Sequence, residues 1–140
     1  MKLIVKKYGG TSVATPTKIK NIAKKIAEES DSNRLVIVLS AMGKTTDNLV
    51  SLAKKCSKNP NLIDYDLLVS SGEQISISLL SMALKDLGKD SVAYTGWQAG
   101  IKTNNAHSTA RILGINANKI KQDLKMKKIV VIAGFQGVNN

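Results

Sequence analysis

A lysine and two glycines follow the first apolar run of the chain, and these residue types suit the binding of a phosphate group. The run MKLIVKKY leads into the segment KYGGTS at residues 7–12. Glycines let backbone N–H groups approach an anion closely, and lysine supplies a positive charge. Neither G-x-x-x-x-G-K-[ST] nor G-x-G-x-x-G, the two familiar phosphate-binding patterns, is present in this segment. Two interpretations therefore stay open: a phosphate cradle, or a glycine turn after a strand whose Lys7 ends in solvent.

Three more clusters of glycine and polar residues follow apolar runs. They are SAMGKTTD at residues 40–47, GWQAG at residues 96–100 and GFQG at residues 134–137. In open α/β sheets, ligands bind beyond the carboxyl ends of the strands. The four turns are therefore expected to share one rim and to form a single site for an anionic ligand.

The apolar runs that precede these clusters alternate with helical patterns. Strands are expected at residues 3–8, 34–41, 91–96 and 128–138, with the first of them buried. Helices are expected at residues 15–30, at residues 64–88 and at residues 116–127. Another helix is expected to begin at about Thr46 and to end at the break at residues 59–61. A short irregular hairpin is expected at residues 101–115. This alternation is typical of an α/β fold with right-handed crossovers and a mostly parallel sheet.

Local signals define several features of these helices. Thr15 is expected to cap the first helix, with Pro16 at its first position, and its apolar stripe is Ile19, Ile22, Ala23 and Ile26. The second helix has the apolar face Leu49, Val50, Leu52, Ala53 and Cys56, so Cys56 is expected in the core rather than as a nucleophile. Gly72 is expected to mark a bend in the third helix, and Gly88 lies near its carboxyl end.

The composition limits the classes of function. The 140 residues suit one domain, and 21 Lys+Arg against 10 Asp+Glu give a formal charge of +11. The lysines are scattered over helical segments and aromatic residues make up 4% of the chain, so nucleic acid is not expected as a partner. The single cysteine cannot form an internal disulfide, and no Cys/His cluster has metal-ligand spacing. The first apolar run is too short to cross a membrane, so we expect a soluble cytoplasmic protein without a membrane partner or a metal site.

Five segments together resemble the amino acid kinase family, and within it the aspartate kinases. KYGGTSV at residues 7–13 resembles the opening signature of the family, and VLSAMGKTTDNL at residues 38–49 resembles the turn after its second strand. LLVSSGEQIS at residues 67–76, TGWQAGIKTNNAHSTARI at residues 95–112 and IVVIAGFQGV at residues 129–138 are similar to three later segments, in the same order. Five ordered motifs are far more specific than any one of them.

The resemblance implies a three-layer α/β/α fold of the amino acid kinase, or carbamate kinase-like, type, here incomplete. It implies transfer of the γ-phosphoryl group of ATP to the β-carboxylate of L-aspartate, which gives 4-phospho-L-aspartate, the first step toward lysine, threonine and methionine. ATP with Mg²⁺ is then the co-substrate. By this resemblance Lys7 is catalytic and meets the transferring group, and Lys7, Tyr8, Gly9 and Gly10 bind the ATP phosphates.

By the same resemblance, Ser40, Thr46 and Glu73 match positions that bind the amino-acid substrate. Glu73 can pair with its ammonium group, because a buried carboxylate needs a cationic partner or hydrogen bonds. Purely structural roles remain open for all three: Glu73 as an acid near a helix start, Thr46 as a helix cap, and Ser40 at the end of a strand.

Four residues stay outside the predicted catalytic set. Trp97 is expected to pack beside its neighbouring glycine, and Gln98 is given no catalytic role. His107 is expected to be exposed or hydrogen-bonded, and Arg111 to form a structural ion pair rather than to meet a carboxylate or phosphate.

The sequence departs from the family pattern in composition and in length. Ser71 stands where threonine is common, and Asn104 and Asn105 stand where an acidic residue is common. An R-G-G-S-D segment, the rest of the ATP and Mg²⁺ sites and the regulatory ACT domains are not among the 140 residues. Residues 1–140 are therefore expected to be the amino-terminal portion of a kinase domain, inactive alone. An unpaired sheet edge or apolar surface would favour self-association.

Two alternatives to an aspartate kinase remain at this point. One is a relative in the same superfamily that phosphorylates glutamate, acetylglutamate, carbamate or a nucleotide. The other is a noncatalytic module that binds an anion or serves in assembly. The segments SAMGKTTDNL and SSGEQIS favour the aspartate kinase.

Overall fold

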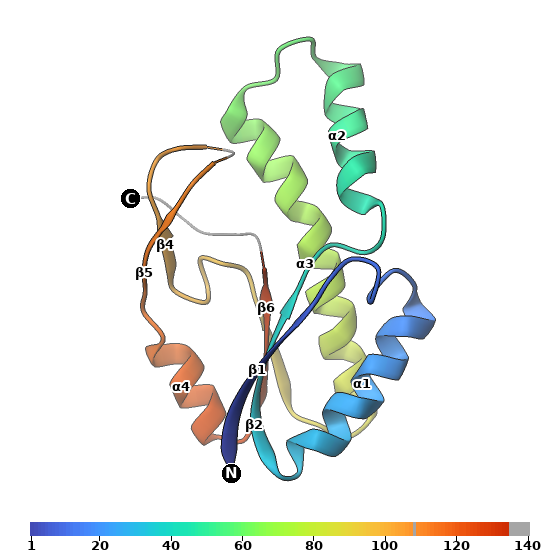
Figure 1. Ribbon diagram of the computed structural model, residues 1–140, viewed down its shortest axis with the longest axis vertical. Coiled ribbons are helices and arrows are strands. Elements are labelled where there is room, and N and C mark those ends of the chain that lie inside the picture. The colour runs from blue at the N-terminus through green and yellow to red at the C-terminus, as the bar shows by residue number, and fades with distance from the viewer. Residues whose placement is uncertain (108, 135–140) are drawn as a thin grey trace.

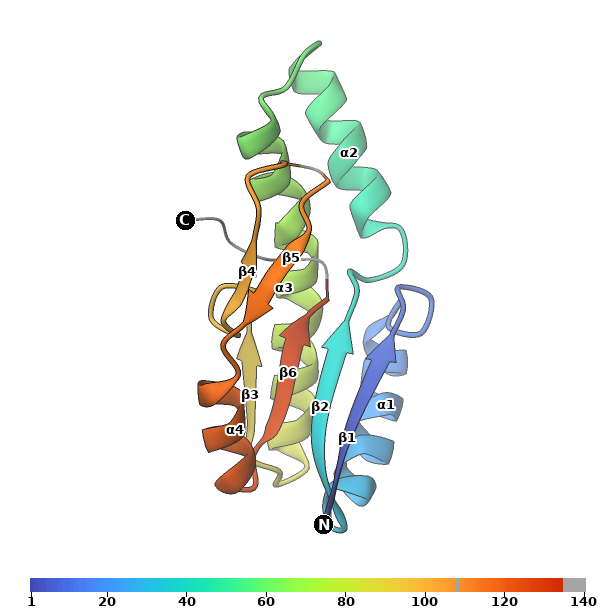
Figure 2. The same cartoon turned by 60° about the vertical axis from the view of Figure 1, so that its left-hand side comes forward.

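A four-stranded parallel sheet forms the centre of the computed structural model, which describes residues 1–107 and 109–134. Its strands lie in the order β1-β2-β6-β3 and all point the same way (Figure 2). Their bounds are β1 Lys2–Tyr8, β2 Asn33–Leu39, β3 Ser91–Tyr94 and β6 Ile129–Ala133. The predicted α/β class with a parallel sheet is confirmed.

Helices lie on both faces of this sheet (Figure 1). They are α1 Pro16–Ser30, α2 Thr45–Cys56, α3 Leu62–Asp86 and α4 Asn118–Lys125. The larger core lies between the sheet and α1 with α3, and the smaller one lies between the sheet and α4. A separate antiparallel hairpin joins β4 Ile101–Thr103 to β5 Ile112–Ile115, with an irregularity after Lys102, as the sequence predicts.

The first strand lies at the edge of the sheet and is covered on one face only. Ile4 and Tyr8 pack against the core under α1 and α3, whereas Leu3 and Val5 point to the other face and are 61% and 64% exposed. The prediction of a buried first strand is therefore wrong. Helix α4 packs against β6, two strands away, and leaves this side of β1 uncovered.

Helix α1 follows its sequence signals. Thr15 precedes it in an extended conformation, and its side-chain oxygen accepts a hydrogen bond from the backbone N–H of Lys18 at 3.3 Å. Pro16 is the first helical residue, where its missing N–H has no cost. The whole predicted stripe from Ile19 to Ile26 is buried.

Helix α2 departs from its prediction because it packs mainly against α3, beyond the end of the sheet (Figure 1). Of its predicted apolar face only Ala53 is buried, and Leu52 is 52% exposed. Cys56 is exposed, so its expected place in the core is wrong. Lys44 occupies the N-cap position without a side-chain cap hydrogen bond, and Thr46 lies within the first turn of the helix.

Helix α3 runs through Gly72 without interruption, and the bend at this glycine stays a prediction. It ends near Gly88, which adopts the left-handed conformation with φ of 73°, as expected for a carboxyl cap. By length and composition α3 is the one helix in the described ranges that suits a membrane span, with 39% of its most apolar window buried. Its packing against α1, β2, β3 and β6 accounts for that apolar character.

Candidate active site

The register of the sheet brings the predicted turns to one rim. Tyr8 pairs with Leu39, and Leu39 pairs with Ala133, so three strands end in the same row. Tyr94, the last residue of β3, pairs with Ile132 one residue earlier. The turns after all four strands therefore leave the sheet at its carboxyl edge, as predicted. In the last predicted cluster only Gly134 is described, and residues 135–137 lie outside the described ranges.

Backbone hydrogen bonds tie these turns to one another. The N–H of Ser40 donates to Tyr8 O at 3.1 Å, and the N–H of Gly43 donates to Gly10 O at 3.0 Å. The N–H of Gly134 donates to Leu39 O at 2.8 Å. The geometry of each turn therefore depends on its neighbours, so the rim is held as a unit.

The two glycines after β1 have different surroundings. A Cβ atom added to Gly10 would lie 2.9 Å from Ala41 O, a distance that real Cβ atoms essentially never show, and 3.3 Å from Gly43 O, which is tighter than most real contacts. A Cβ atom added to Gly9 would meet nothing within 4 Å. Gly10 is therefore required for packing between two turns, whereas Gly9 borders open space, as a ligand-facing glycine should.

Lys7 and Lys6 point to opposite faces of the sheet, because side chains alternate along a strand. Lys6 is paired with Glu29 of α1, and this hydrogen bond is the main reason that the pKa of Lys6 is raised. Lys7 is exposed, lies in register with Val38 and forms no ion pair with any residue in the described ranges. Its ammonium group is thus available for an anion at the rim.

Glu73 lies against the turn after β2 because α3 packs there at close range. A Cβ atom at the preceding residue, Gly72, would be 3.2 Å from side-chain atoms of Ala41, Thr45 and Leu49. The side chain of Glu73 is 6% exposed. Glu73 is therefore a buried acid at the corner where α3 packs on the turn after β2.

Ser76 fixes this corner. Its hydroxyl is fully buried and lies 2.8 Å from Ser40 O and 3.0 Å from Glu73 O, so it bridges α3 and the end of β2. The predicted set did not include Ser76. Its position one helical turn after Glu73 was the signal, because residues three apart share a helix face.

Thr46 lies at the exposed start of α2, next to Thr45. No side chain in the described part of the chain caps this helix end. The first amides of α2 therefore present partial positive charge close to Ser40 and Glu73. Such a helix start favours a carboxylate or phosphate.

The third turn and the hairpin supply structural contacts. The side-chain oxygen of Gln98 accepts a hydrogen bond from Thr95 N at 3.0 Å. Trp97 is 72% exposed, so the expectation that it packs is wrong. His107 lies 3.3 Å from Asp66, which confirms a hydrogen-bonded histidine. Arg111 forms no ion pair within residues 1–107 and 109–134, contrary to expectation.

Below the rim, a buried polar contact holds α4 against β3. The hydroxyl of Tyr94 donates to Asp123 at 2.5 Å, and Lys128 lies 3.3 Å from the same carboxylate. Burial, helped by this hydrogen bond, raises the pKa of Tyr94 to about 12. Lys119 lies over the ring at 4.4 Å from its centre. These contacts join Tyr94, the last residue of β3, to α4 and to Lys128 just before β6.

Comparison with known proteins decides the family. The sequence profile described as the amino acid kinase family matches residues 2–140. The chain belongs to the amino acid kinase family. Relatives of this amino acid kinase chain include aspartokinase 2 of Bacillus subtilis (strain 168), 52% identical over 99% of the chain, and the aspartokinase of Geobacillus stearothermophilus, 49% identical over 99%.

Solved structures agree with this assignment. Aspartate kinase from Synechocystis superposes with a TM-score of 0.80 at 44% identity, over 96% of this amino acid kinase chain and 22% of the other. E. coli aspartokinase III, solved in complex with aspartate and ADP, gives a TM-score of 0.81 at 22% identity, over 99% of this chain and 42% of the other, and so supports the fold alone. The chain spans about a third of the length of its sequence relatives, 34% for aspartokinase 2.

Proposed function

We propose that residues 1–140 form the amino-terminal, aspartate- and phosphate-binding portion of an aspartate kinase. The reaction is transfer of the γ-phosphoryl group of ATP to the β-carboxylate of L-aspartate, which gives 4-phospho-L-aspartate. The names of the sequence relatives and of the solved neighbours support this substrate. The domain assignment rests on the coverage of about a third of those relatives.

One observation carries the proposal: two turns of different chemistry are hydrogen-bonded together at one rim. The turn after β1 offers the amides of Gly9 and Gly10 and follows Lys7, which suits phosphate. The turn after β2 lies against the buried Glu73, which suits an amino acid. Phosphoryl transfer needs its two substrates aligned and the developing charge neutralised, and this arrangement serves both needs.

On the amino-acid side, Glu73 attracts the ammonium group of aspartate. In this proposal the hydroxyls of Ser40 and Thr46, with the first amides of α2, donate hydrogen bonds to its carboxylates; the uncapped start of α2 supports this. A binding site for a zwitterion needs both an anionic and a donor-rich part. The corner between β2, α2 and α3 has both.

On the phosphate side, Lys7 neutralises charge on the transferring group, and the backbone at Tyr8, Gly9 and Gly10 approaches the phosphates. The open space beside Gly9 fits a phosphate at this position. Bound ATP with Mg²⁺ supplies the phosphoryl group and a divalent charge. The described residues hold no group of three His, Cys, Asp or Glu side chains suited to a metal.

Calorimetric titration of the purified chain with aspartate, ATP and Mg-ATP tests this assignment. We expect aspartate to bind alone, and Glu73→Gln to weaken it at least about 10-fold, because a charge-assisted hydrogen bond contributes ~1.5–3 kcal/mol. Gln74→Glu, made in the otherwise wild-type chain, is the control and should leave aspartate binding unchanged. Gln74 is the next residue of the helix after Glu73, and its side chain is exposed. Binding of phosphate compounds without aspartate would favour an anion-binding module, and no binding of aspartate would refute the proposal.

The chain alone is proposed to lack kinase activity, since positioning of both substrates contributes ~7–11 kcal/mol to such reactions and half a site cannot provide it. A coupled assay for ADP release checks this: turnover with aspartate at ordinary kinase rates would contradict it. The cytoplasm, with its reduced thiols, is the proposed setting of the single exposed cysteine. Homo-oligomer formation is also proposed.

A further inference from the structure

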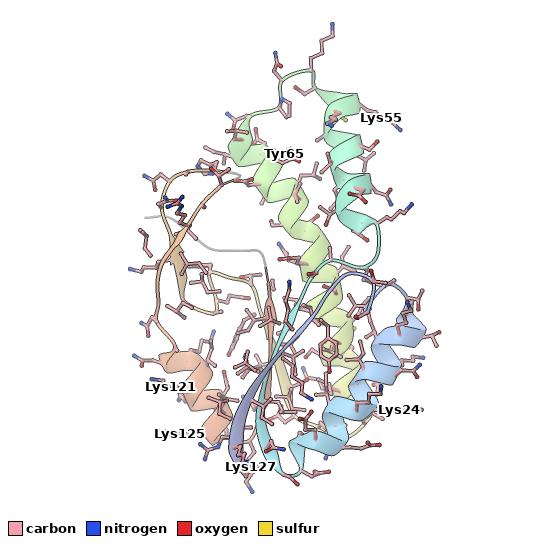
Figure 3. All side chains as sticks on the ribbon, in the orientation of Figure 1. Lys24, Lys55, Tyr65, Lys121, Lys125 and Lys127 are labelled. Carbon is pink, nitrogen blue, oxygen red and sulfur yellow. The ribbon has the colours of Figure 1, made fainter. Side chains whose placement is uncertain are left out.

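Two buried serines join helix α3 to the sheet, one at each edge of the sheet. The helix begins beyond the strands, where Tyr65 lies near the top of Figure 3, and runs down one face of the sheet. At the amino edge, the hydroxyl of Ser81 lies 2.9 Å from the hydroxyl of Ser91, the first residue of β3. At the carboxyl edge, the hydroxyl of Ser76 lies 2.8 Å from Ser40 O. The two contacts are chemically alike, and the second of them lies at the rim with the candidate site.

The contact with Ser76 completes the fixation of the Ser40 backbone. The N–H of Ser40 donates to Tyr8 O at 3.1 Å, and the C=O of Ser40 accepts from the Ser76 hydroxyl. These two groups belong to the peptide units on either side of the Ser40 Cα atom. Because each peptide unit is planar, holding both of them fixes φ and ψ of Ser40. The direction in which the Ser40 side chain leaves the backbone is thereby fixed too.

The same hydroxyl also contacts the turn of α3 that carries Glu73. It lies 3.0 Å from Glu73 O, and the side chain of Glu73 is buried. A serine hydroxyl has one proton to donate, and the shorter distance of 2.8 Å favours Ser40 O as its acceptor. Ser76 therefore sets the position of Ser40 relative to Glu73.

Close packing of α3 against the turn after β2 makes this contact possible. Gly72 lies one helical turn before Ser76, on the same side of the helix. A Cβ atom at Gly72 would be 3.2 Å from side-chain atoms of Ala41 and Thr45, so a larger residue would push the helix away. Ser76 is itself 0% exposed, so solvent does not reach its hydroxyl. The position of α3 therefore determines the position of Ser40 O.

We propose that Ser76 is a positioning residue for the amino-acid substrate and acts through the backbone of Ser40. This inference rests on the proposed binding of aspartate between Ser40 and Glu73. A serine that only filled space here could be an alanine, which is the better helix former. The hydroxyl adds a directional hydrogen bond, and this bond ends on the residue whose side chain is assigned to the substrate. Small displacements at such a site have large effects, on the order of 100-fold in rate for about 1 Å.

Calorimetric titration with L-aspartate tests the role of Ser76 against that of Ser81. We expect Ser76→Ala to raise the Kd of aspartate about 10-fold, because the Ser40 side chain is no longer held in one direction. Ser81→Ala should leave the Kd unchanged. It is the matched control, since it removes a buried hydroxyl of the same helix at the opposite edge of the sheet. Loss of stability alone raises the apparent Kd only by the reciprocal of the folded fraction, which urea unfolding of each variant supplies.

The outcomes separate this inference from the proposed function. If the wild type binds aspartate and the corrected Kd of Ser76→Ala is unchanged, the inference is wrong and the proposed function stands. An equal rise in Kd for Ser81→Ala would also overturn the inference, since the position of the hydroxyl at the rim would then not matter. No binding by the wild type would refute both. If Ser76→Ala is unfolded in circular dichroism, Ser76→Cys takes its place: a thiol is a weak donor, so the same rise in Kd is expected, and an unchanged Kd contradicts the inference.

Discussion

Replacement of Gly10 by alanine should destabilise the chain, whereas the same change at Gly9 should not. The new methyl group at Gly10 would lie 2.9 Å from the carbonyl oxygen of Ala41, which is backbone and cannot rotate away. Overpacking of this kind costs ~1–3 kcal/mol. Alanine also restricts the unfolded chain, which offsets ~0.4–1 kcal/mol. The expected net loss is roughly 1–2 kcal/mol.

Gly9→Ala is a matched control, since its methyl group would meet nothing within 4 Å. Only the unfolded-state effect remains, so this variant should gain ~0.4–1 kcal/mol. The two neighbouring variants should thus differ by roughly 2 kcal/mol in the free energy of unfolding. The relief of strain at Gly10 would move the turn after β1 away from the turn after β2, and the Gly43–Gly10 hydrogen bond would lengthen.

Urea unfolding followed by circular dichroism measures the difference, with the slope m checked for constancy. Titration with inorganic phosphate adds a second measurement. Gly9→Ala should weaken phosphate binding while the protein stays stable, because its methyl group fills the space assigned to the ligand. Equal stability of the two variants, or a larger loss for Gly9→Ala, would refute the argument that Gly10 alone is required for packing.

Three further changes have defined outcomes. Ser76→Ala should lower the free energy of unfolding by ~1–3 kcal/mol, because it removes the buried hydroxyl that donates to the half-buried carbonyl of Ser40. Ser78→Ala, at an exposed hydroxyl, should change the free energy of unfolding little, and similar urea midpoints for the two variants would contradict this. The pKa of Tyr94 is raised from 10.0 to about 12, so its protonated form contributes fully to the free energy of unfolding below pH 10. This contribution is lost as the pH rises to about 12, and Tyr94→Phe should flatten the dependence of the free energy of unfolding on pH in that range. Lys127→Gly should stabilise the chain by ~1 kcal/mol, since Lys127 has φ of 60°. Lys121→Gly inside α4 should destabilise the chain by a similar amount, and thermal melts that shift in the same direction for both variants would argue against left-handed strain.

The sequence predicted the helices and strands well where the signal is local. Thr15 and Pro16 define the start of α1 through a cap and a fixed φ, and neither depends on distant residues. The rim was predictable for a related reason. Parallel strands of similar length must end at the same edge, so the turns at Gly9 and Ser40 come together.

Predictions about burial were less successful, because periodicity shows that a face is apolar but not what covers it. Leu52 and Cys56 belong to a regular apolar stripe, yet α2 packs mainly against α3 and leaves them exposed. Val5 lies in a strongly apolar strand, yet β1 is at the edge of the sheet. Both errors concern neighbours that are far away in sequence.

The sequence by itself determined the α/β class, the order of its elements, the family and the residues of the turns that follow β1 and β2. Only the tertiary structure decided which of two adjacent glycines packs and which faces open space, and that Ser76 holds the corner beside Glu73. It also decided that the outer face of α3 stays uncovered. The physical reason is that backbone propensity and spacing act within a few residues, whereas close approach, burial and hydrogen-bond partners depend on atoms that the fold brings together from distant segments.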